Sequence, residues 1–464
     1  MELSVDLATA SREELIHLIG QLLSHIEALE ARISELESRQ RPPPDALGEQ
    51  KPPSWVKANR PAPAGKERKK RAHGFARRRE EPTHISADTL SRTEHALAHC
   101  PQCQVPLVGG RVCGRRQVIT LPRVRARVTE HVVLERTCPQ CQQRWAPKPD
   151  WGAHTVGRQR MGVSVQSEVS VLREECRLPF GVIQRYLKGR YGLHLSVGEL
   201  VALVRGVAVR GQWEYRQLKQ EIRDSPVVYG DETGWRENGR NGYLWSFSTP
   251  RVRYFLYRPS RAGAVVEEVL GEEFDGVLVS DFYGAYNMYQ GPHQRCWVHL
   301  LRAIHQLKER DPQDLALAQW AQGVREVYDR AQAYPGPDPG LPKVVQRAQR
   351  ETQQWKYQQE LWSICQPHIR TEALMSVLCQ RVERFLPELF TFVAQPQVAA
   401  DNNAAERSLR PPVVSRKISG GTRSPQGSET KSVLASLFGT WRLQGRDPYQ
   451  AVRQTLTRPL HAPV

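Results

Sequence analysis

The segment DNNAAERSLRPP, which starts at Asp401, places a single glutamate, Glu406, among amide and guanidinium groups. A helix here would present Asn403, Glu406 and Arg410 on one face, because they follow one another at helical spacing. Such a face could offer the carboxylate to a metal ion while the arginines bind phosphate groups. Two purely structural interpretations compete: a capping box formed by Asn403 and Glu406, and a surface ion pair between Glu406 and Arg410.

We expect this helix to begin with an N-cap at Asp401 or Asn402. It should end at Pro411 and Pro412, because proline lacks the amide hydrogen that continues a helix. Amide and basic side chains in and after the helix are candidates for contacts with nucleic-acid phosphates. They are Asn402, Asn403, Arg407, Arg410, Arg416 and Lys417.

Two apolar runs further upstream each lead to an aspartate. SPVVYGDETGWRE is expected to be a strand that ends at Asp231, and FDGVLVSDFYGAY a buried strand that ends at Asp281. One aspartate after a strand is usually a turn residue, but two on neighbouring strands would converge at one sheet edge. Convergent carboxylates repel each other unless cations lie between them, and Mg²⁺ prefers oxygen ligands. With Glu406 as a third ligand, the sequence predicts a two-metal site suited to phosphodiester chemistry.

The elements around these residues suggest how they are positioned. GYLWSFST and VRYFLYRP read as an antiparallel meander, AGAVVEEVLG as a short helix, and the order is the opening of a ribonuclease-H-like domain. The segment from Asp281 to Glu406 is far longer than one sheet crossover needs, and much of it has helical patterning. Cys296 and His299 lie within it in CWVH, but two ligands make an incomplete metal site. Trp297 could be a core residue or could stack on a base, and we expect core.

Two CPQC strings predict a structural zinc site. Four thiolates in a pair of C-x-x-C knuckles are the ligand set of a closed tetrahedral zinc ion. The ligands are Cys100, Cys103, Cys138 and Cys141. Strand-like alternation around Val124, Val128 and Val132 between the knuckles favours a zinc ribbon, and Cys113 and His99 are left over.

The beginning of the chain has heptad spacing. Isoleucines recur every seven residues from Ile19, and leucines from Leu15 do the same, a pattern typical of a parallel two-stranded coiled coil. An amphipathic helix packed on its own domain is the alternative, but the proline-rich stretch that follows offers it no core. We therefore expect dimerisation, or a higher oligomer, through this helix.

A basic, proline-rich linker comes next, at about residues 41–83. Its KERKKRAHGFARRR run could be a solvated, disordered segment or an arm that binds phosphates. The basic residues in question are Lys69, Lys70, Arg71, Arg77, Arg78 and Arg79. Further on, RLPFGVIQRYLKGRYGLHLSVGELVALVRG reads as two helices with Ser196 as an N-cap. Either a DNA-binding helix-turn-helix or an ordinary helical hairpin fits that pattern.

The composition supports a polyanionic partner. The 464 residues carry a net charge of +17, with a sequence pI near 9.7, and nucleic acid is the commonest partner of such a chain. An anionic membrane surface is the competing explanation. Separately, no segment has the ~20 apolar residues that span a bilayer. Glu2 and Asp6 stand where an export signal would be apolar, so we expect a cytoplasmic protein.

Four strings together point to a known family. DETGW, VSDFYGAY, CWVHLLR and DNNAAERSLRP followed by SRKISGG resemble the transposase family of bacterial insertion sequence sixty-six, a group of DDE transposases. The resemblance implies that Asp231, Asp281 and Glu406 are the catalytic, metal-binding residues, with two Mg²⁺ (or Mn²⁺) as cofactors. It also implies that Cys296, Trp297 and His299 support the active site, and that an all-helical insertion separates the second and third carboxylates. The strings KRAHGFARRRE and RKIS depart from the family's usual pattern, and neither contains a proposed metal ligand.

The sequence thus predicts a multidomain α+β protein. The expected parts are a coiled-coil dimerisation helix (residues 1–40), a basic linker (41–90), a zinc ribbon (91–150) with one structural Zn²⁺, a helical, helix-turn-helix-like DNA-binding region (151–222) and a ribonuclease-H-like catalytic domain (223–464) with its helical insertion at about 305–395.

The implied function is that of a DNA transposase, which cuts the ends of an insertion sequence and joins them to target DNA. Its expected partners are both kinds of DNA, a second copy of the chain and small accessory proteins of the same element, at the bacterial nucleoid. A ribonuclease-H-type nuclease without strand joining is one alternative, and the predicted DNA-binding head argues against it. A non-catalytic DNA-binding protein derived from a transposase is the other, and the presence of all three carboxylates argues against that.

Overall fold

The computed structural model describes residues 92–113, 121, 124–148, 154–156 and 159–458, together with Gly20, Ser24 and Ala28, which are helical. It divides into two compact units, Met1–Ile119 and Thr120–Val464, and each is described by itself. The rest of the predicted coiled coil and the basic run of the linker lie outside the described residues. The linker residues concerned are Lys69, Lys70, Arg71, Arg77, Arg78 and Arg79.

The second unit is built on a mixed sheet with the strand order β5-β4-β3-β6-β7. The strands are β3 (Val227–Glu237), β4 (Arg240–Ser248), β5 (Arg253–Arg258), β6 (Val277–Ser280) and β7 (His293–Arg295). Strands β3, β4 and β5 pair antiparallel, as the predicted meander requires, and β6 and β7 extend the sheet in parallel. The protein therefore belongs to the mixed α+β class that the sequence predicts.

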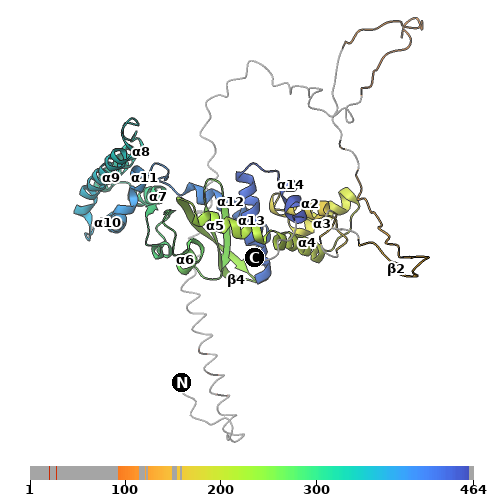
Figure 1. The fold of residues 1–464 in the computed structure, drawn as a ribbon. Helices are drawn as coiled ribbons and strands as arrows, with labels where there is room; N and C mark the ends of the chain where they lie inside the picture. Colours follow the sequence, from red (N-terminus) through yellow and green to blue (C-terminus); the bar gives the residue numbers. More distant parts are fainter. Residues whose placement is uncertain are drawn as a thin grey trace, which may run out of the picture. The chain divides into compact units, whose positions relative to one another are not determined.

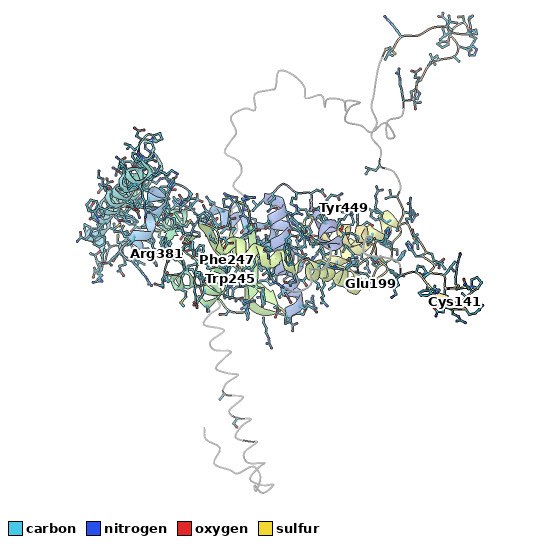
Figure 2. The ribbon with its side chains drawn as sticks, viewed as in Figure 1. Cys141, Glu199, Trp245, Phe247, Arg381 and Tyr449 are labelled. Carbon is cyan, nitrogen blue, oxygen red and sulfur yellow. The ribbon has the colours of Figure 1, made fainter. Side chains whose placement is uncertain are left out.

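Apolar residues of the sheet and of helices from both ends of the unit form one core. The helices are α2 (Val163–Glu174), α3 (Phe180–Tyr191), α4 (Val197–Arg210), α5 (Gln212–Arg223), α6 (Ala264–Leu270), α13 (Pro425–Leu443) and α14 (Pro448–Thr457). Trp245 and Phe247, labelled in Figure 2, are fully buried in it with stacked rings 6.4 Å apart. The boundary expected at residue 222 thus does not coincide with a boundary of the core, because the helices before it pack with α13, α14 and the sheet.

Helix α13 covers the edge of the sheet. The hydroxyls of Ser432, Ser436 and Thr440 accept hydrogen bonds from the amides of Tyr257, Phe255 and Arg253 on β5, at 2.9, 2.8 and 3.0 Å. Side chains on a helix thus satisfy the amides that an exposed edge strand would leave free for another chain to pair with.

The predicted helical hairpin is present. Helix α3 ends at Gly192, whose φ of 66° is left-handed, and α4 starts at the N-cap Ser196. Ser196 and Glu199 form a complete capping box, so the N-cap prediction is confirmed. Whether the pair binds DNA stays a prediction.

The segment between β7 and α12 is mostly helical. It contains α7 (Trp297–Arg310), α8 (Leu315–Gln332), α9 (Lys343–Cys365), α10 (Ser376–Leu389) and the short α11 (Thr391–Ala394), which share a second apolar core. Figure 1 shows α8, α9 and α10 gathered beside one another at one end of this unit. None of the helices in the described part of the chain combines the length and apolar composition that a membrane span needs.

The strands predicted between the two CPQC strings are not formed over residues 124–135. The strands found near the second string are β1 (Arg136–Thr137) and β2 (Arg144–Trp145), which pair as a short hairpin. The prediction was wrong because alternating valines form a strand only where a partner or a core receives them. Here Val128 and Val132 are 90% and 71% exposed.

Candidate active site

We expected Asp231 at the end of a strand, but it lies inside strand β3. Strand β3 continues to Glu237 because β4 stays paired with it on one side, from Tyr229–Ser248 to Glu237–Arg240. On its other side, β3 pairs with β6 only as far as Tyr229, opposite Val279. Asp231 therefore lies just beyond the point where β6 stops. We call this gap in the sheet the β3–β6 notch, and it leaves room beside β3 for side chains of other elements.

Asp281 directly follows β6, which ends at Ser280, one residue before the predicted end of the strand. Its Oδ1 accepts a hydrogen bond of 2.9 Å from the amide of Tyr283, which fixes the turn that leaves the strand. Because β3 and β6 are adjacent and parallel, Asp231 and Asp281 come to the same edge of the sheet. Both are half-buried.

Glu406 is in the first turn of α12 (Asn403–Ser419). We expected the helix to end at the proline pair. It passes through Pro411 and Pro412 instead and ends at Gly420, whose φ is 76°. Each proline removes one helical hydrogen bond. Packing offsets this loss, because Leu409, Pro412 and Ser415 are buried beneath the helix.

Asn402 occupies the N-cap position of α12, but its side chain does not cap the helix. Its Nδ2 instead donates a 2.7 Å hydrogen bond to the carbonyl of Gly230, the residue before Asp231. Among the described side chains Glu406 has no ion pair with Arg410, and its carboxylate lies 3.8 Å from Nε2 of His299. Asn403 is the first residue of the helix and not its N-cap, so the predicted capping box is not formed among the described residues, and neither is the predicted ion pair.

A series of backbone and side-chain hydrogen bonds joins the segments that carry the three carboxylates. The amide of Cys296 donates to the carbonyl of Ser280 at 2.8 Å, and the amide of Asn402 donates to Cys296 Sγ at 3.2 Å. The bond from Asn402 to Gly230 completes the series. Ser280, Asn402 and Gly230 belong to segments far apart in the sequence. These bonds therefore hold together the three segments that carry Asp281, Glu406 and Asp231.

The CWVH string thus acts mainly as a connector. Cys296 is fully buried, and burial raises the pKa of its thiol, so it stays protonated and is a poor metal ligand. Trp297 is fully buried and donates from Nε1 to the carbonyl of Leu389, which confirms it as a core residue. His299 is the member that reaches a predicted site residue, Glu406.

The neighbouring carboxylates act on Asp231 electrostatically. Burial, then the charge of Glu232 and those of Asp281 and Glu406, raise the pKa of Asp231 from 3.8 to about 7. A hydrogen bond of 2.9 Å from the amide of Glu232 to Asp231 Oδ1 acts in the opposite direction. A buried carboxylate beside further carboxylates is disfavoured unless positive charge joins it.

The donors fit a hard divalent cation in their chemistry. Asp231, Asp281 and Glu406 offer carboxylate oxygens, and the buried Oδ1 of Asn402 has no hydrogen-bond partner among the described residues. Their side chains do not yet form a closed cage: in the part of the chain that the structure covers, no three His, Cys, Asp or Glu side chains are grouped closely enough to hold a metal ion.

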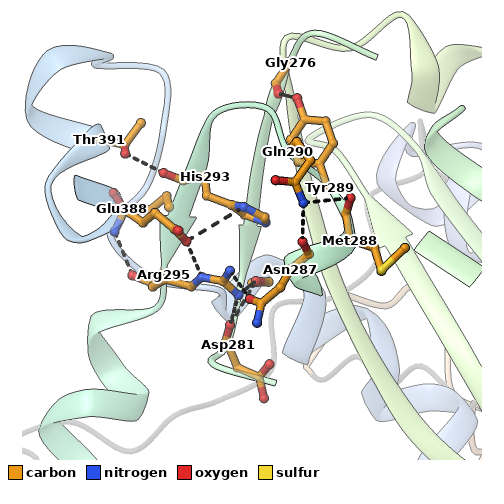
Figure 3. Close-up of polar contacts among 12 residues, drawn as sticks. Gly276, Asp281, Asn287, Met288, Tyr289, Gln290, His293, Arg295, Glu388 and Thr391 are labelled. Atoms are coloured by element: carbon orange, nitrogen blue, oxygen red, sulfur yellow. Dashed lines mark hydrogen bonds and ion pairs between the residues drawn. The ribbon is translucent and has the colours of Figure 1, made fainter. Parts of the chain in front are cut away.

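Arg295 was not predicted as a site residue, yet it supports Asp281 directly. It is 1% exposed, and its NH1 donates to the carbonyl of Asp281 at 3.0 Å and to Ser280 Oγ at 3.2 Å. Its other nitrogens bond to Glu388 Oε2 at 2.5 Å and to Asn287 Oδ1 at 2.7 Å (Figure 3). The guanidinium thus ties α10 of the helical segment to the end of β6. The only sequence signal is its position directly before CWVH.

His293 lies beside this network and is neutral. Burial, helped by the positive charge of Arg295, lowers the pKa of His293 to about 3. Its Nδ1 is 3.8 Å from Glu388 Oε2, so Arg295 alone balances the charge of that carboxylate (Figure 3).

A second group missed by the sequence surrounds Glu232. This side chain is 2% exposed, accepts a 2.5 Å hydrogen bond from the hydroxyl of Tyr286 and pairs with Arg261. The Arg261 guanidinium lies 3.7 Å from the ring centre of Tyr283. Because these contacts occupy the Glu232 carboxylate, it is not available to a metal ion. Of the two carboxylates in the string DETGW, Asp231 is the one that is free to bind a metal.

The predicted DNA contacts on α12 differ in exposure. Arg407, Arg410 and Lys417 are exposed, whereas Asn402 is buried and Asn403 half-buried. Arg416 is half-buried and donates to Thr233 Oγ1 at 3.0 Å and to the carbonyl of Gly234, so it also holds α12 against β3. Their binding to DNA stays a prediction.

The two CPQC strings have the same local geometry. The amide of Cys100 donates to Val105 at 2.9 Å and that of Cys138 to Gln143 at 2.8 Å, while Gln104 and Gln142 donate back to the two cysteine carbonyls at 3.0 and 2.9 Å. Both glutamines have left-handed φ, 55° and 59°. Backbone amides lower the pKa of Cys100 and of Cys138. Such turns favour thiolates, but Cys100 and Cys103 belong to the first unit and Cys138 and Cys141 to the second, so a shared zinc ion stays a prediction.

Comparisons with known proteins add a family. The model of the transposase IS66 family matches residues 158–430. The chain is also similar to three uncharacterized proteins of Sinorhizobium fredii (strain NBRC 101917 / NGR234). It is 24% identical to protein y4qI over 276 residues (52% of this chain, 49% of that protein), 27% identical to y4jO over 173 residues (37% and 49%) and 25% identical to y4jD over 297 residues (58% and 57%). The chain thus spans 49% to 57% of the length of these relatives.

Proposed function

Because the chain belongs to the transposase IS66 family, we propose that it is a DNA transposase that cleaves the ends of an insertion sequence and joins them to target DNA. The observation that carries the proposal is the series of hydrogen bonds Ser280–Cys296–Asn402–Gly230. These bonds join the chain segments that carry Asp281, Glu406 and Asp231, at the notch where β6 ends beside β3.

We further propose that the sheet and α12 are a ribonuclease-H-like core. The strand order supports this, with an antiparallel meander followed by two parallel strands. So does the position of the first two carboxylates at the β3–β6 notch, with the third on a helix that follows a long insertion.

Asp231, Asp281 and Glu406 would hold two Mg²⁺ (or Mn²⁺). When bound, the ions would supply charge stabilisation of the attacking and leaving oxygens of a phosphodiester. The chain's own contribution is positioning: Asn402 and Cys296 fix the distance between the segments, and Arg295 holds the carbonyl of Asp281. His299 would orient the Glu406 carboxylate from 3.8 Å.

The reaction has two displacements. In the first, a water oxygen bonds to the phosphorus at the element's end and the bond to the 3′ oxygen breaks, which leaves a 3′ hydroxyl. In the second, that hydroxyl oxygen attacks a phosphorus of target DNA, and the bond from this phosphorus to its own 3′ oxygen breaks. Neither step forms a covalent bond to the protein.

The remaining parts would bring DNA to this site. We propose that the coiled coil pairs two protomers so that both ends of the element are held together. The zinc ribbon, with Cys100, Cys103, Cys138 and Cys141 around one Zn²⁺, and the α3–α4 hairpin would recognise the terminal repeats. The protein would act at the nucleoid in the bacterial cytoplasm.

The test is a strand-transfer assay with purified protein, DNA that carries the element's own ends, and Mg²⁺ or Mn²⁺. We expect metal-dependent nicking at the end and a joined product for the wild type, and neither for Glu406→Gln. Glu383→Gln, an exposed carboxylate on α10, is the matched control and should behave like the wild type.

Other outcomes distinguish other functions. Nicking without a joined product would favour a ribonuclease-H-type nuclease. Tight binding to the ends without cleavage, unchanged by Glu406→Gln, would indicate a non-catalytic DNA-binding protein.

A further inference from the structure

A cavity of about 230 Å³ is lined by residues of α12, α13 and the edge strand β5, together with Glu174 of α2. Its floor is made by Arg253 and Phe255 of β5, and α12 contributes Arg407 and Pro411. It adjoins a different face of α12 from the one that carries Glu406, because Arg407 is the next residue along the helix. Nothing in the proposed chemistry uses this cavity.

The cavity is positively charged, and part of that charge has no partner. Glu174 and Lys431 both line the cavity and balance each other at 2.6 Å, and Arg442 is balanced by Glu175 at 2.6 Å. Neither Arg253 nor Arg407 has an ion pair among the described residues. Arg253 donates from NH1 to the carbonyls of Thr249 and Val252, at 2.6 and 3.3 Å, and its other side-chain nitrogens have no acceptor in this part of the chain.

An uncompensated guanidinium at this depth is costly. Arg253 is only 9% exposed, and burial, together with the charge of Arg407, lowers its pKa to about 10. The group remains charged at neutral pH, so an anion that enters the cavity gains charge-assisted hydrogen bonds without displacing a carboxylate. A buried guanidinium and a second, exposed one in the same lining suit the oxygens of a phosphate.

The apolar wall indicates what the phosphate is attached to. Phe255, Pro411 and Phe438 line the same cavity and could contact a sugar, whereas a small free anion would leave them unused. We propose that the Arg253–Arg407 cavity binds a backbone phosphate of DNA, next to the helix that carries Glu406. This inference rests on the proposed function, since it takes DNA as the source of the phosphate.

The first experiment uses inorganic phosphate as the probe on the full chain. Thermal unfolding is followed in 20 mM sodium phosphate and in sodium chloride of equal ionic strength. Phosphate should raise the Tm of the wild type by about 2 °C, through binding to the folded state alone. Arg407→Gln should lose this shift and Arg407→Lys should keep part of it. Arg407 is exposed, so these variants should fold normally.

Arg310→Gln is the control, because Arg310 is an exposed arginine of α7 that does not line the cavity. It should show the full phosphate shift. An equal shift in the wild type and in Arg407→Gln, or no shift in either, would overturn the assignment of the cavity as a phosphate site.

The second experiment tests DNA as the source. Single methylphosphonate linkages, which remove one phosphate charge, are scanned along duplexes that carry the element's end. One position should weaken binding of the wild type about tenfold and have no further effect on Arg407→Gln. If inorganic phosphate protects the protein but no position behaves in this way, the assignment to DNA is overturned.

The nicking assay on the same duplexes separates this inference from the proposed function. The wild type could nick and join the duplexes while no methylphosphonate position has an effect that depends on Arg407. That result would overturn the cavity inference and leave the proposed function standing. A phosphate shift that depends on Arg407, in a protein that neither binds nor nicks the ends, would overturn the transposase proposal and the DNA source together.

Discussion

Replacing Asp231 by asparagine should stabilise the metal-free protein at pH 8 while it abolishes nicking. The substitution removes a negative charge from a half-buried position beside Glu232, Asp281 and Glu406. An asparagine side-chain oxygen can still accept the 2.9 Å hydrogen bond that the amide of Glu232 donates to Asp231. The variant therefore loses the cost of burying a charge and the repulsion from the neighbouring carboxylates, and it keeps the bond.

The magnitude follows from the pKa of Asp231, which rises from 3.8 to about 7. Because the folded-state pKa is higher than the unfolded one, the wild type loses stability from this group as the pH rises from 3.8 to about 7. Each pKa unit corresponds to about 1.4 kcal/mol, so the full penalty is on the order of 4 kcal/mol above pH 7. About 2–3 kcal/mol of it should develop between pH 5 and pH 8.

The assay is urea denaturation of wild type and Asp231→Asn at pH 5 and pH 8, in the presence of EDTA. The advantage of the variant should grow between the two pH values. Asp275→Asn is the control, because Asp275 is an exposed carboxylate outside the cluster, and its effect should stay within about 0.5 kcal/mol. Added Mg²⁺ should stabilise the wild type and leave Asp231→Asn unchanged.

Two results would refute this reasoning. One is a variant that is no more stable than the wild type at pH 8. The other is a stability difference that is the same at pH 5 and pH 8, since the cost of ionising a buried Asp231 beside other carboxylates must depend on pH in this range. Either would mean that Asp231 is not buried beside these carboxylates in solution.

Asn402→Asp should lower the free energy of unfolding by about 3–5 kcal/mol at pH 7, because it sets a buried carboxylate against the Gly230 carbonyl. Asn403→Asp, at the half-buried start of the same helix, should change it by less than about 1 kcal/mol, and equal urea midpoints for the two variants would contradict the Asn402–Gly230 contact. Arg295→Met should cost about 3–5 kcal/mol by leaving Glu388 unpaired, and should raise the Mg²⁺ concentration needed for nicking. Arg295→Lys should recover part of both losses, and a Mg²⁺ requirement that Arg295→Met leaves unchanged would count against a positioning role. Metal analysis should find one zinc per chain in the wild type and in Cys113→Ser but none in Cys138→Ser, and retention of zinc by Cys138→Ser would rule out a four-cysteine site.

Local signals in the sequence were sufficient for many elements. Ser196 followed by Glu199 predicts the start of α4, and the structure has the capping box there. The apolar and aromatic runs of β4 and β5 predict an antiparallel pair, and they form one. These features depend on neighbouring residues, so tertiary context had little opportunity to override them. The four family strings also indicated the transposase family, which the family match confirms.

Tertiary structure decided the lengths of elements and the use of individual side chains. Strand β3 extends past Asp231 because β4 continues beside it, and α12 extends past Pro411 and Pro412 because its buried face packs on the sheet. Conversely, residues 124–135 have the alternation of a strand but no core to receive it. Pairing and burial outweigh propensity in all three cases.

The site shows the same division. The sequence by itself determined which groups could bind metal, because a carboxylate's chemistry belongs to the residue. It could not determine that Asn402 would bond to Gly230 instead of capping its helix, or that Arg295 would hold the carbonyl of Asp281. Those contacts join segments far apart in the chain, and only the packing of the sheet against α12 and the helical segment brings them within hydrogen-bond distance.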